Sequence, residues 1–222
     1  MRRLIPALTV LLAAPLAFAQ AGGGSPQMSY EAVTKAPVGS WAEYTTSMKG
    51  RTEQVKIRYS LVERSAKKMA LEIDGQTPMG ALLMRMEYEP AGEGAWKLSK
   101  AKMQMGGGAA QEMPIPPSTP LLKKGDELGE VVGKSSVKTA VGTFDAKQYK
   151  KTLPQGTFDL WMSDKVFPVG LVKQSDAEGK LTTVLTGTGT GATAKMTATT
   201  AAPAATPPPP AEKKPAAATP AK

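Results

Sequence analysis

The sequence predicts a mostly β protein, with a curved antiparallel sheet or half-barrel of about ten strands and little helix. Apolar and polar residues alternate over many short segments, which is the period of a half-buried strand. Short turn-like segments separate these stretches and favour an up-and-down meander. Because strands twist, a sheet of about ten strands curls strongly, and we expect an apolar concave side.

The first β-block follows a short helix expected around residues 30 to 35. A weaker strand is expected at 41–48, and the alternating pattern repeats at 69–73 and 96–98. Two further strands each place four apolar side chains on one face. These side chains are Val55, Ile57, Tyr59 and Leu61 on one strand, and Leu82, Met84, Met86 and Tyr88 on the other. If both faces line the concave side, these eight residues are the predicted ligand-binding residues.

Residues 106–126 interrupt this pattern with a run of three glycines followed by four prolines. Proline has no backbone N–H to donate to a ladder, so this segment is expected to be a crossing loop or a lid. A second β-block follows. Its expected strands are 131–141, 143–152, 157–163, 171–177 and 180–188.

The N-terminus has the order of an export signal. Two arginines precede an apolar run over residues 4–16, and Ala17, Phe18 and Ala19 follow as a small-x-small cleavage site. Residues 1–19 are therefore expected to be a signal peptide, and 20–29 a flexible leader. The sequence contains no cysteine, so no lipidation cysteine and no disulfide can form. A periplasmic location fits these features best.

The C-terminal residues 191–222 are low-complexity Ala, Pro, Thr and Lys. They cannot bury enough surface to offset the entropy of ordering, so we expect a disordered tail after one domain over 30–190. Two roles stay open for the tail. It is either a passive spacer or a basic arm that reaches peptidoglycan or an anionic membrane surface.

Charge and residue types exclude several function classes. The formal net charge is +9, but the lysines are scattered among acids, so no nucleic-acid partner is expected. Histidine and cysteine are both absent, which excludes Ser-His-Asp and Cys-His sites and ordinary zinc sites. Ser65 and Lys68 match S-x-x-K by chance, since the partner motifs are missing. The glycines 187, 189 and 191 lack the lysine and helix of a phosphate-binding loop. We therefore expect no enzyme, no catalytic residue, no metal and no cofactor.

The twelve methionines are the unusual feature of the composition. Met84 and Met86, like Met103 and Met105, are spaced by two, so each pair projects from one strand face. Three explanations stay open. The thioethers fill irregular gaps in a core, form an adaptable pocket for acyl chains, or bind Cu(I) as soft ligands.

Three segments carry a resemblance to a known family. They are VGTFDAKQY at 141–149, FDLWMSD at 158–164 and PVGLVK at 168–173. This run resembles the LolA/LolB periplasmic lipoprotein-carrier superfamily, which sorts lipoproteins to the outer membrane, and related exported β-domain families. The resemblance covers about residues 130–175. It implies an eleven-stranded half-barrel closed by helices, with an apolar interior that holds acyl groups. The sequence departs from the family by having little helix for a lid, unless residues 106–126 take that role.

Together these features predict a non-enzymatic envelope protein that binds a hydrophobic or lipid ligand on an apolar concave sheet. The alternative is a structural or interaction protein with a filled core and no ligand. A deep apolar cavity would favour the first, and a filled interior with an exposed apolar patch would favour the second.

Overall fold

The computed structural model describes residues 28–196, except for 78–79, 118, 126–127 and 154–155. These residues form one helix, α2 (Tyr30–Lys35), and one antiparallel sheet of eleven strands. The strands are β1 (Trp41–Met48), β2 (Gln54–Arg64), β3 (Met69–Thr77), β4 (Gly80–Pro90), β5 (Trp96–Met105), β6 (Gln111–Glu112), β7 (Glu130–Thr139), β8 (Gly142–Leu153), β9 (Gly156–Met162), β10 (Leu171–Asp176) and β11 (Leu181–Gly189).

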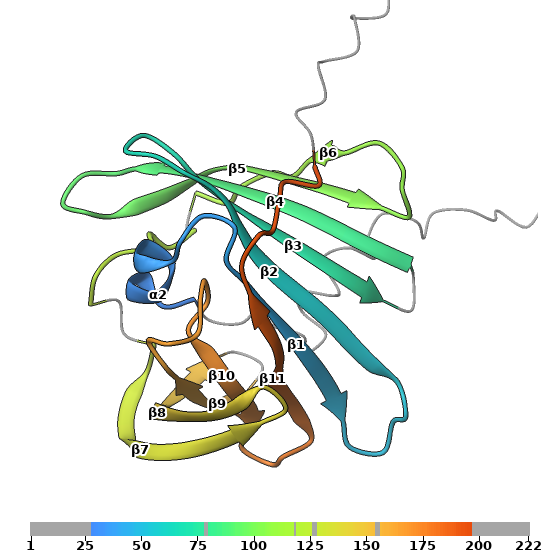
Figure 1. Ribbon diagram of the computed structural model, residues 1–222, viewed down its shortest axis with the longest axis vertical. Coiled ribbons are helices and arrows are strands. Elements are labelled where there is room, and N and C mark those ends of the chain that lie inside the picture. The colour runs from blue at the N-terminus through green and yellow to red at the C-terminus, as the bar shows by residue number, and fades with distance from the viewer. Residues whose placement is uncertain (1–27, 78–79, 118, 126–127, 154–155, 197–222) are drawn as a thin grey trace, which may run out of the picture.

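The sheet consists of two meanders joined in the middle. Its strand order is β6-β5-β4-β3-β2-β1-β11-β10-β9-β8-β7, so β1 pairs with β2 on one side and with β11 on the other. Figure 1 shows the sheet bent about β1 and β11, with α2 between its two halves. The edge strands β6 and β7 do not pair, so the sheet stays open. The expected curved antiparallel sheet with little helix is confirmed, with eleven strands.

The proline-rich segment differs from the loop expected over 106–126. Gln111 and Glu112 form the short strand β6 against β5. Farther along the same edge, Trp96 and Leu122 exchange two backbone hydrogen bonds of 2.8 Å. The prolines at 114, 116 and 117 lie between these two contacts and have no N–H to donate, which explains why the pairing is interrupted. The segment therefore follows the edge of β5 before the chain continues to β7.

Helix α2 fills one end of the concave side. The Ser29 hydroxyl caps it by accepting from Ala32 N at 3.4 Å. The fully buried side chains of Val33 and Ala36 then pack against the sheet. Their neighbours in this core cluster are Leu61, Met69, Leu71 and Tyr88. The face of the sheet that carries Leu61 and Tyr88 is therefore the concave one.

A second core cluster lies at the bend and joins the two halves of the sheet. Tyr44 and Tyr59 meet edge to face, with ring centroids 5.8 Å apart. The Tyr44 hydroxyl donates to Leu171 O at 2.8 Å, which ties β1 to β10. Phe158 and Leu160 of β9 pack into the same cluster. The interior at the bend is thus filled by side chains.

The chain after β11 continues across the outer face of the sheet. Backbone amides of Lys195 and Met196 donate to the two carboxylate oxygens of Glu72, at 2.7 and 3.1 Å. Met196 is buried, and Ala192 N donates to Gly39 O at 2.9 Å. We name residues 190–196 the strap. The strap corrects the boundary expected at 190, because the first residues of the expected disordered tail pack on the domain.

The other expectations for the termini fall outside the described residues. These are the signal peptide at 1–19, most of the leader at 20–29, and the tail from 197 onward. Within the described ranges, no helix combines the length and the apolar character needed to span a bilayer.

Candidate functional site

The eight predicted binding residues lie on one face of the sheet. Strand β3 lies between β2 and β4, and residues directly opposite one another in a ladder point to the same side. The register gives three rows: Leu61, Leu71 and Met86; Tyr59, Ile73 and Met84; and Ile57, Gly75 and Leu82. Val55 and Tyr88 continue the same faces along β2 and β4. The structure therefore brings all eight residues together on the concave side.

Burial divides this face into a covered end and an open end. Tyr59, Leu61 and Tyr88 are buried in the two core clusters. Ile57, Met84 and Met86 are half-buried and pack against those clusters. The last two residues, Val55 and Leu82, are half-buried and belong to neither cluster. Helix α2 covers only one end of the face, because it is six residues long.

Strand β5 extends the open end. Met103 lies opposite Met84, and Met105 lies opposite Leu82. Both methionines are half-buried. We name the half-buried side chains at this end the open strip; it consists of Val55, Ile57, Leu82, Met84, Met103 and Met105. The spacing of Met103 and Met105 was visible in the sequence, but only the register shows that they continue the predicted site.

Burial also decides what the tyrosines on this face can do. It raises the pKa of Tyr88 to about 12 and raises the pKa of Tyr59 further. Their hydroxyls therefore stay protonated at neutral pH. They can pack or donate a hydrogen bond, but they cannot act as bases.

The S-x-x-K tetrapeptide forms the turn between β2 and β3. The Ser65 hydroxyl accepts from the backbone amides of Lys67 and Lys68 at 3.2 and 3.1 Å. The Lys68 ammonium lies 3.4 Å from Glu63 and 3.2 Å from Glu87. Ser65 is therefore a turn residue and Lys68 a member of a surface ion-pair network.

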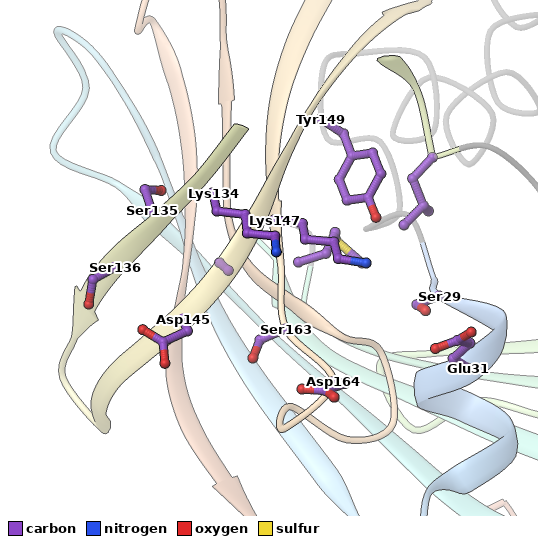
Figure 2. Close-up of a pocket in the computed structure, with 13 residues that line it drawn as sticks. Ser29, Glu31, Lys134, Ser135, Ser136, Asp145, Lys147, Tyr149, Ser163 and Asp164 are labelled. Atoms are coloured by element: carbon purple, nitrogen blue, oxygen red, sulfur yellow. The ribbon is translucent and has the colours of Figure 1, made fainter. Parts of the chain in front are cut away.

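A separate cleft of about 560 Å³ lies between α2 and strands β7 to β9 (Figure 2). Its volume is in the usual range for small-molecule sites. The lining contains an apolar base, a tyrosine, four serines and five charged side chains. The apolar and aromatic residues are Leu128, Ala146, Met162 and Tyr149, and the charged residues are Glu31, Lys134, Asp145, Lys147 and Asp164.

A close approach of Gly170 to the first residues of α2 holds this helix at the edge of the cleft. Gly170 has a φ of +84°, and a Cβ there would lie 3.0 Å from the Cβ of Ala32 and 3.1 Å from that of Ser29. Ser29 N also donates to Val169 O at 2.9 Å. Glycine is the residue that allows both the positive φ and this approach. It thereby fixes the wall of the cleft that carries Ser29 and Glu31.

Of the five charged side chains in the cleft lining, only Glu31 forms an ion pair within the described residues. Lys134 of β7 lies directly opposite Lys147 of β8. Glu31 forms an ion pair with Lys35 at 3.6 Å. Sequence reasoning missed this cleft because its residues come from α2, three strands and the loop after β9. On each strand alone, they resemble an ordinary solvated face.

The described part of the chain contains no group of three or more acidic side chains placed to hold a metal ion. Copper binding by the methionine pairs stays one of the three explanations left open for them, whereas the prediction from the sequence was that there is no metal site. Full burial of Met69, Met162 and Met196 agrees with core filling for those three, whereas Met84, Met103 and Met105 remain half-buried.

No protein-family model matches the chain, and no curated protein matches it in sequence. The resemblance to the LolA/LolB superfamily therefore stays a prediction. Among solved structures, the chain is similar to a candidate lipoprotein from Parabacteroides distasonis, with 14% identity and a TM-score of 0.43, over 74% of this chain and 100% of that one. It is also similar to a candidate exported protein with a YmcC-like fold from Bacteroides fragilis, with 13% identity and a TM-score of 0.36, over 69% of this chain and 96% of the other. Both likenesses concern the fold, and neither identifies a ligand or an activity.

Proposed function

We propose that this protein is a non-enzymatic binding protein of the bacterial periplasm whose concave sheet face holds the acyl chain of a lipid or another amphiphile. The observation that supports this most is the open strip. The strand register places its apolar side chains on the concave face, yet they stay half-buried. They lie beyond the end of α2. The location rests on the export-signal order of the N-terminus.

The chemistry of the strip suits an acyl chain. Three of its six side chains are methionines, Met84, Met103 and Met105. Thioethers are flexible and polarisable, so they adapt to chains of different shape. An acyl chain lying on the strip would remove apolar surface from water, which stabilises binding by roughly 25 cal/mol per Å². Core methionines such as Met69 have no such surface left to cover.

Binding of a fluorescent fatty acid, 11-(dansylamino)undecanoic acid, tests the proposal. Met84→Gln places an amide on the strip, where it would lose water without gaining a partner, at a cost of about 1 to 3 kcal/mol. The dissociation constant should therefore rise by roughly 5-fold or more. Leu83→Gln is the matched control, because Leu83 is half-buried on the same strand but points to the opposite face.

Two results would overturn the proposal. One is a wild-type protein that shows no saturable binding of the probe. The other is an equal loss of binding in Met84→Gln and Leu83→Gln at matched thermal midpoints, since a site-specific contact would then be absent.

The exposed valines of β7 favour a second candidate function, that of an interaction protein. Val131 is 61% exposed and Val132 is 44% exposed on this edge strand. An edge with apolar side chains can add a strand from another chain. If the fatty-acid probe does not bind, sedimentation velocity of the wild type against Val131→Lys tests self-association through β7. Association that is lost in the variant would support this function.

A further inference from the structure

Four solvent-exposed charged side chains line the cleft, and none of them has a side-chain partner among the described residues. In the described part of the chain, Lys134, Lys147, Asp145 and Asp164 take part in no side-chain ion pair or hydrogen bond. The cleft thus presents charges of both signs that have not neutralised one another. A ligand that carries one anionic and one cationic group would complement both sets at once.

The two lysines suit a phosphate. They lie directly opposite each other on β7 and β8, and like charges in that position destabilise a sheet. An anion held between them would remove this repulsion. Figure 2 shows both side chains reaching into the middle of the cleft. Lysine is a common phosphate ligand, and each of the two unesterified oxygens of a phosphodiester can accept a hydrogen bond from one ammonium group.

The two aspartates suit a primary amine. Figure 2 places Asp145 and Asp164 in the lower part of the view, apart from the lysine side chains and also apart from each other, so each carboxylate is a separate candidate partner for an ammonium group. Ionised carboxylates accept hydrogen bonds and donate none. A primary ammonium has three N–H groups for them, whereas a quaternary ammonium has none. The third acid, Glu31, is already paired with Lys35.

The base of the cleft belongs to the same core as the concave face. Met162 is part of the core cluster at the bend, and Leu128 and Tyr149 pack against that cluster. Met84 and Met86 pack against it as well. The cleft and the acyl-binding face therefore border one continuous apolar core.

We propose that this cleft binds a zwitterionic phosphate ester with a free primary amine, the phosphoethanolamine chemistry of a lipid head group. The lysines would hold the phosphate, and one of the two aspartates the ammonium. The lipid form of this ligand rests on the proposed function, because its acyl chain would need the concave face.

Isothermal titration calorimetry with three short-chain lipids, used below their micelle concentrations, tests the assignment. Dihexanoyl phosphatidylethanolamine should bind roughly 10-fold more tightly than dihexanoyl phosphatidylglycerol or phosphatidylcholine, because only its head group offers a charged N–H donor to an aspartate. Equal or tighter binding of phosphatidylglycerol would overturn the proposal. This comparison uses the wild-type protein and does not depend on the folding of any variant.

Two double variants separate the roles of the charges. Lys134→Gln with Lys147→Gln should weaken all three lipids roughly 10-fold or more, since all carry a phosphate. Asp145→Asn with Asp164→Asn should remove only the preference for phosphatidylethanolamine. The control is Lys138→Gln, an exposed lysine of β7 outside the cleft lining, which should change nothing. Unchanged binding in the lysine variant would contradict the assignment.

A further titration with glycerophosphoethanolamine distinguishes the head group from the whole lipid. Binding as tight as that of the dihexanoyl lipid would support the cleft and count against acyl binding on the concave face. Weaker but amine-selective binding would support both. Saturable binding of the dansyl fatty acid without any preference for phosphoethanolamine would overturn this inference and leave the proposed function standing.

Discussion

The indole of Trp41 lies directly on the backbone of Gly189, where a Cβ would sit 2.7 Å from the ring carbon Cζ2. Gly187, two residues earlier, lies under the same ring, with 3.0 Å to Cζ3. The guanidinium of Arg58 also lies over this ring, 4.2 Å from its centroid, and the indole N–H donates to Thr190 O at 3.3 Å. The alternating glycines of β11 therefore make room for an aromatic ring between β1 and the strap.

Gly189→Ala should displace this ring. No ordinary Cβ contact is as short as 2.7 Å, so either Trp41 or β11 must move, at a cost of about 1 to 3 kcal/mol in the free energy of unfolding. Urea unfolding and tryptophan emission measure the two effects, and we expect a lower stability with a red-shifted emission. The control is Gly133→Ala on β7, where a Cβ would meet nothing within 4 Å. Equal stability of Gly189→Ala and wild type would contradict the close contact.

Glu72→Gln should loosen the strap. The carboxylate is 3% exposed, accepts from Lys195 N and Met196 N, and forms an ion pair with Arg85 at 3.1 Å. An amide has one acceptor oxygen and no charge, so removing this buried partner should cost about 2 to 4 kcal/mol. Hydrogen exchange of the amides at 195 and 196 should become much faster. Glu89→Gln, at an exposed position of β4, is the control. Protection that persists in Glu72→Gln would show that other contacts hold the strap.

Truncation gives a second measurement of the strap. A chain that ends after Met196 should keep the thermal midpoint of the full chain. One that ends after Gly191 loses both amide donors to Glu72 and the buried Met196 side chain. A loss of a few kcal/mol in a domain of this size lowers the midpoint by roughly 5 to 10 °C. Identical midpoints for the two chains would mean that the strap adds no stability.

Acid should weaken the ion-pair network around Arg85. Burial by itself raises the pKa of Glu87, but hydrogen bonds and charge from Arg85 and Lys68 outweigh it and lower that pKa below the ordinary value of 4.5. A carboxyl group whose pKa is lower in the folded state stabilises the fold above about pH 4.5, and this contribution is lost as the pH falls through the folded-state pKa. Unfolding free energies at pH 7 and pH 3 should therefore differ less in Glu87→Gln than in wild type. An equal difference in both proteins would exclude this role.

The buried tyrosines should stay protonated at an alkaline pH at which exposed tyrosines ionise. Burial raises the pKa of Tyr88 to about 12, and it raises the pKa of Tyr44 well above 10, with a smaller contribution from the neighbouring Tyr59. Since these groups ionise near pH 10 when unfolded, their stabilising effect is complete below pH 10 and is lost as the pH rises above it. At pH 11, tyrosinate absorbance at 295 nm should increase further when guanidinium unfolds the chain. No increase on unfolding would show that these hydroxyls were already ionised in the folded protein.

The local alternation of apolar and polar residues was sufficient to predict the positions of most strands. The sequence predicted a strand at 41–48 and a short helix around 30–35, and the structure has β1 and α2 at those residues. It also placed the eight concave residues on a shared face, because strand periodicity fixes which side chains point together. It could not show that α2 covers Tyr88 and leaves Leu82 half-buried, since burial depends on which distant segment packs over a face.

Contacts between distant segments account for the features that sequence reasoning missed. Glu72 alternates with apolar neighbours and resembles a solvent-facing residue, and nothing in the composition of residues 190–196 indicates that they would cover it. The short strand β6 was not predicted, because prolines follow it in the sequence and its pairing depends on the distant strand β5. The alternating glycines at 187 and 189 had no role in the sequence analysis beyond lacking the features of a phosphate-binding loop, because the role that the structure gives them depends on Trp41, about 150 residues earlier in the chain.

The central position of β1 has a consequence for the order of events during synthesis. Its partner on one side, β11, is the last strand to be made, and the register pairs Ala42 with Thr188. Until β11 emerges, the first meander would end in an unpaired edge that carries Ala42 and Tyr44, both buried in the finished protein. Pairing across so long a stretch of chain is slow compared with hairpin formation. The chain therefore completes its fold only after translation has passed β11, and a product that ends before Leu181 would keep an aggregation-prone edge.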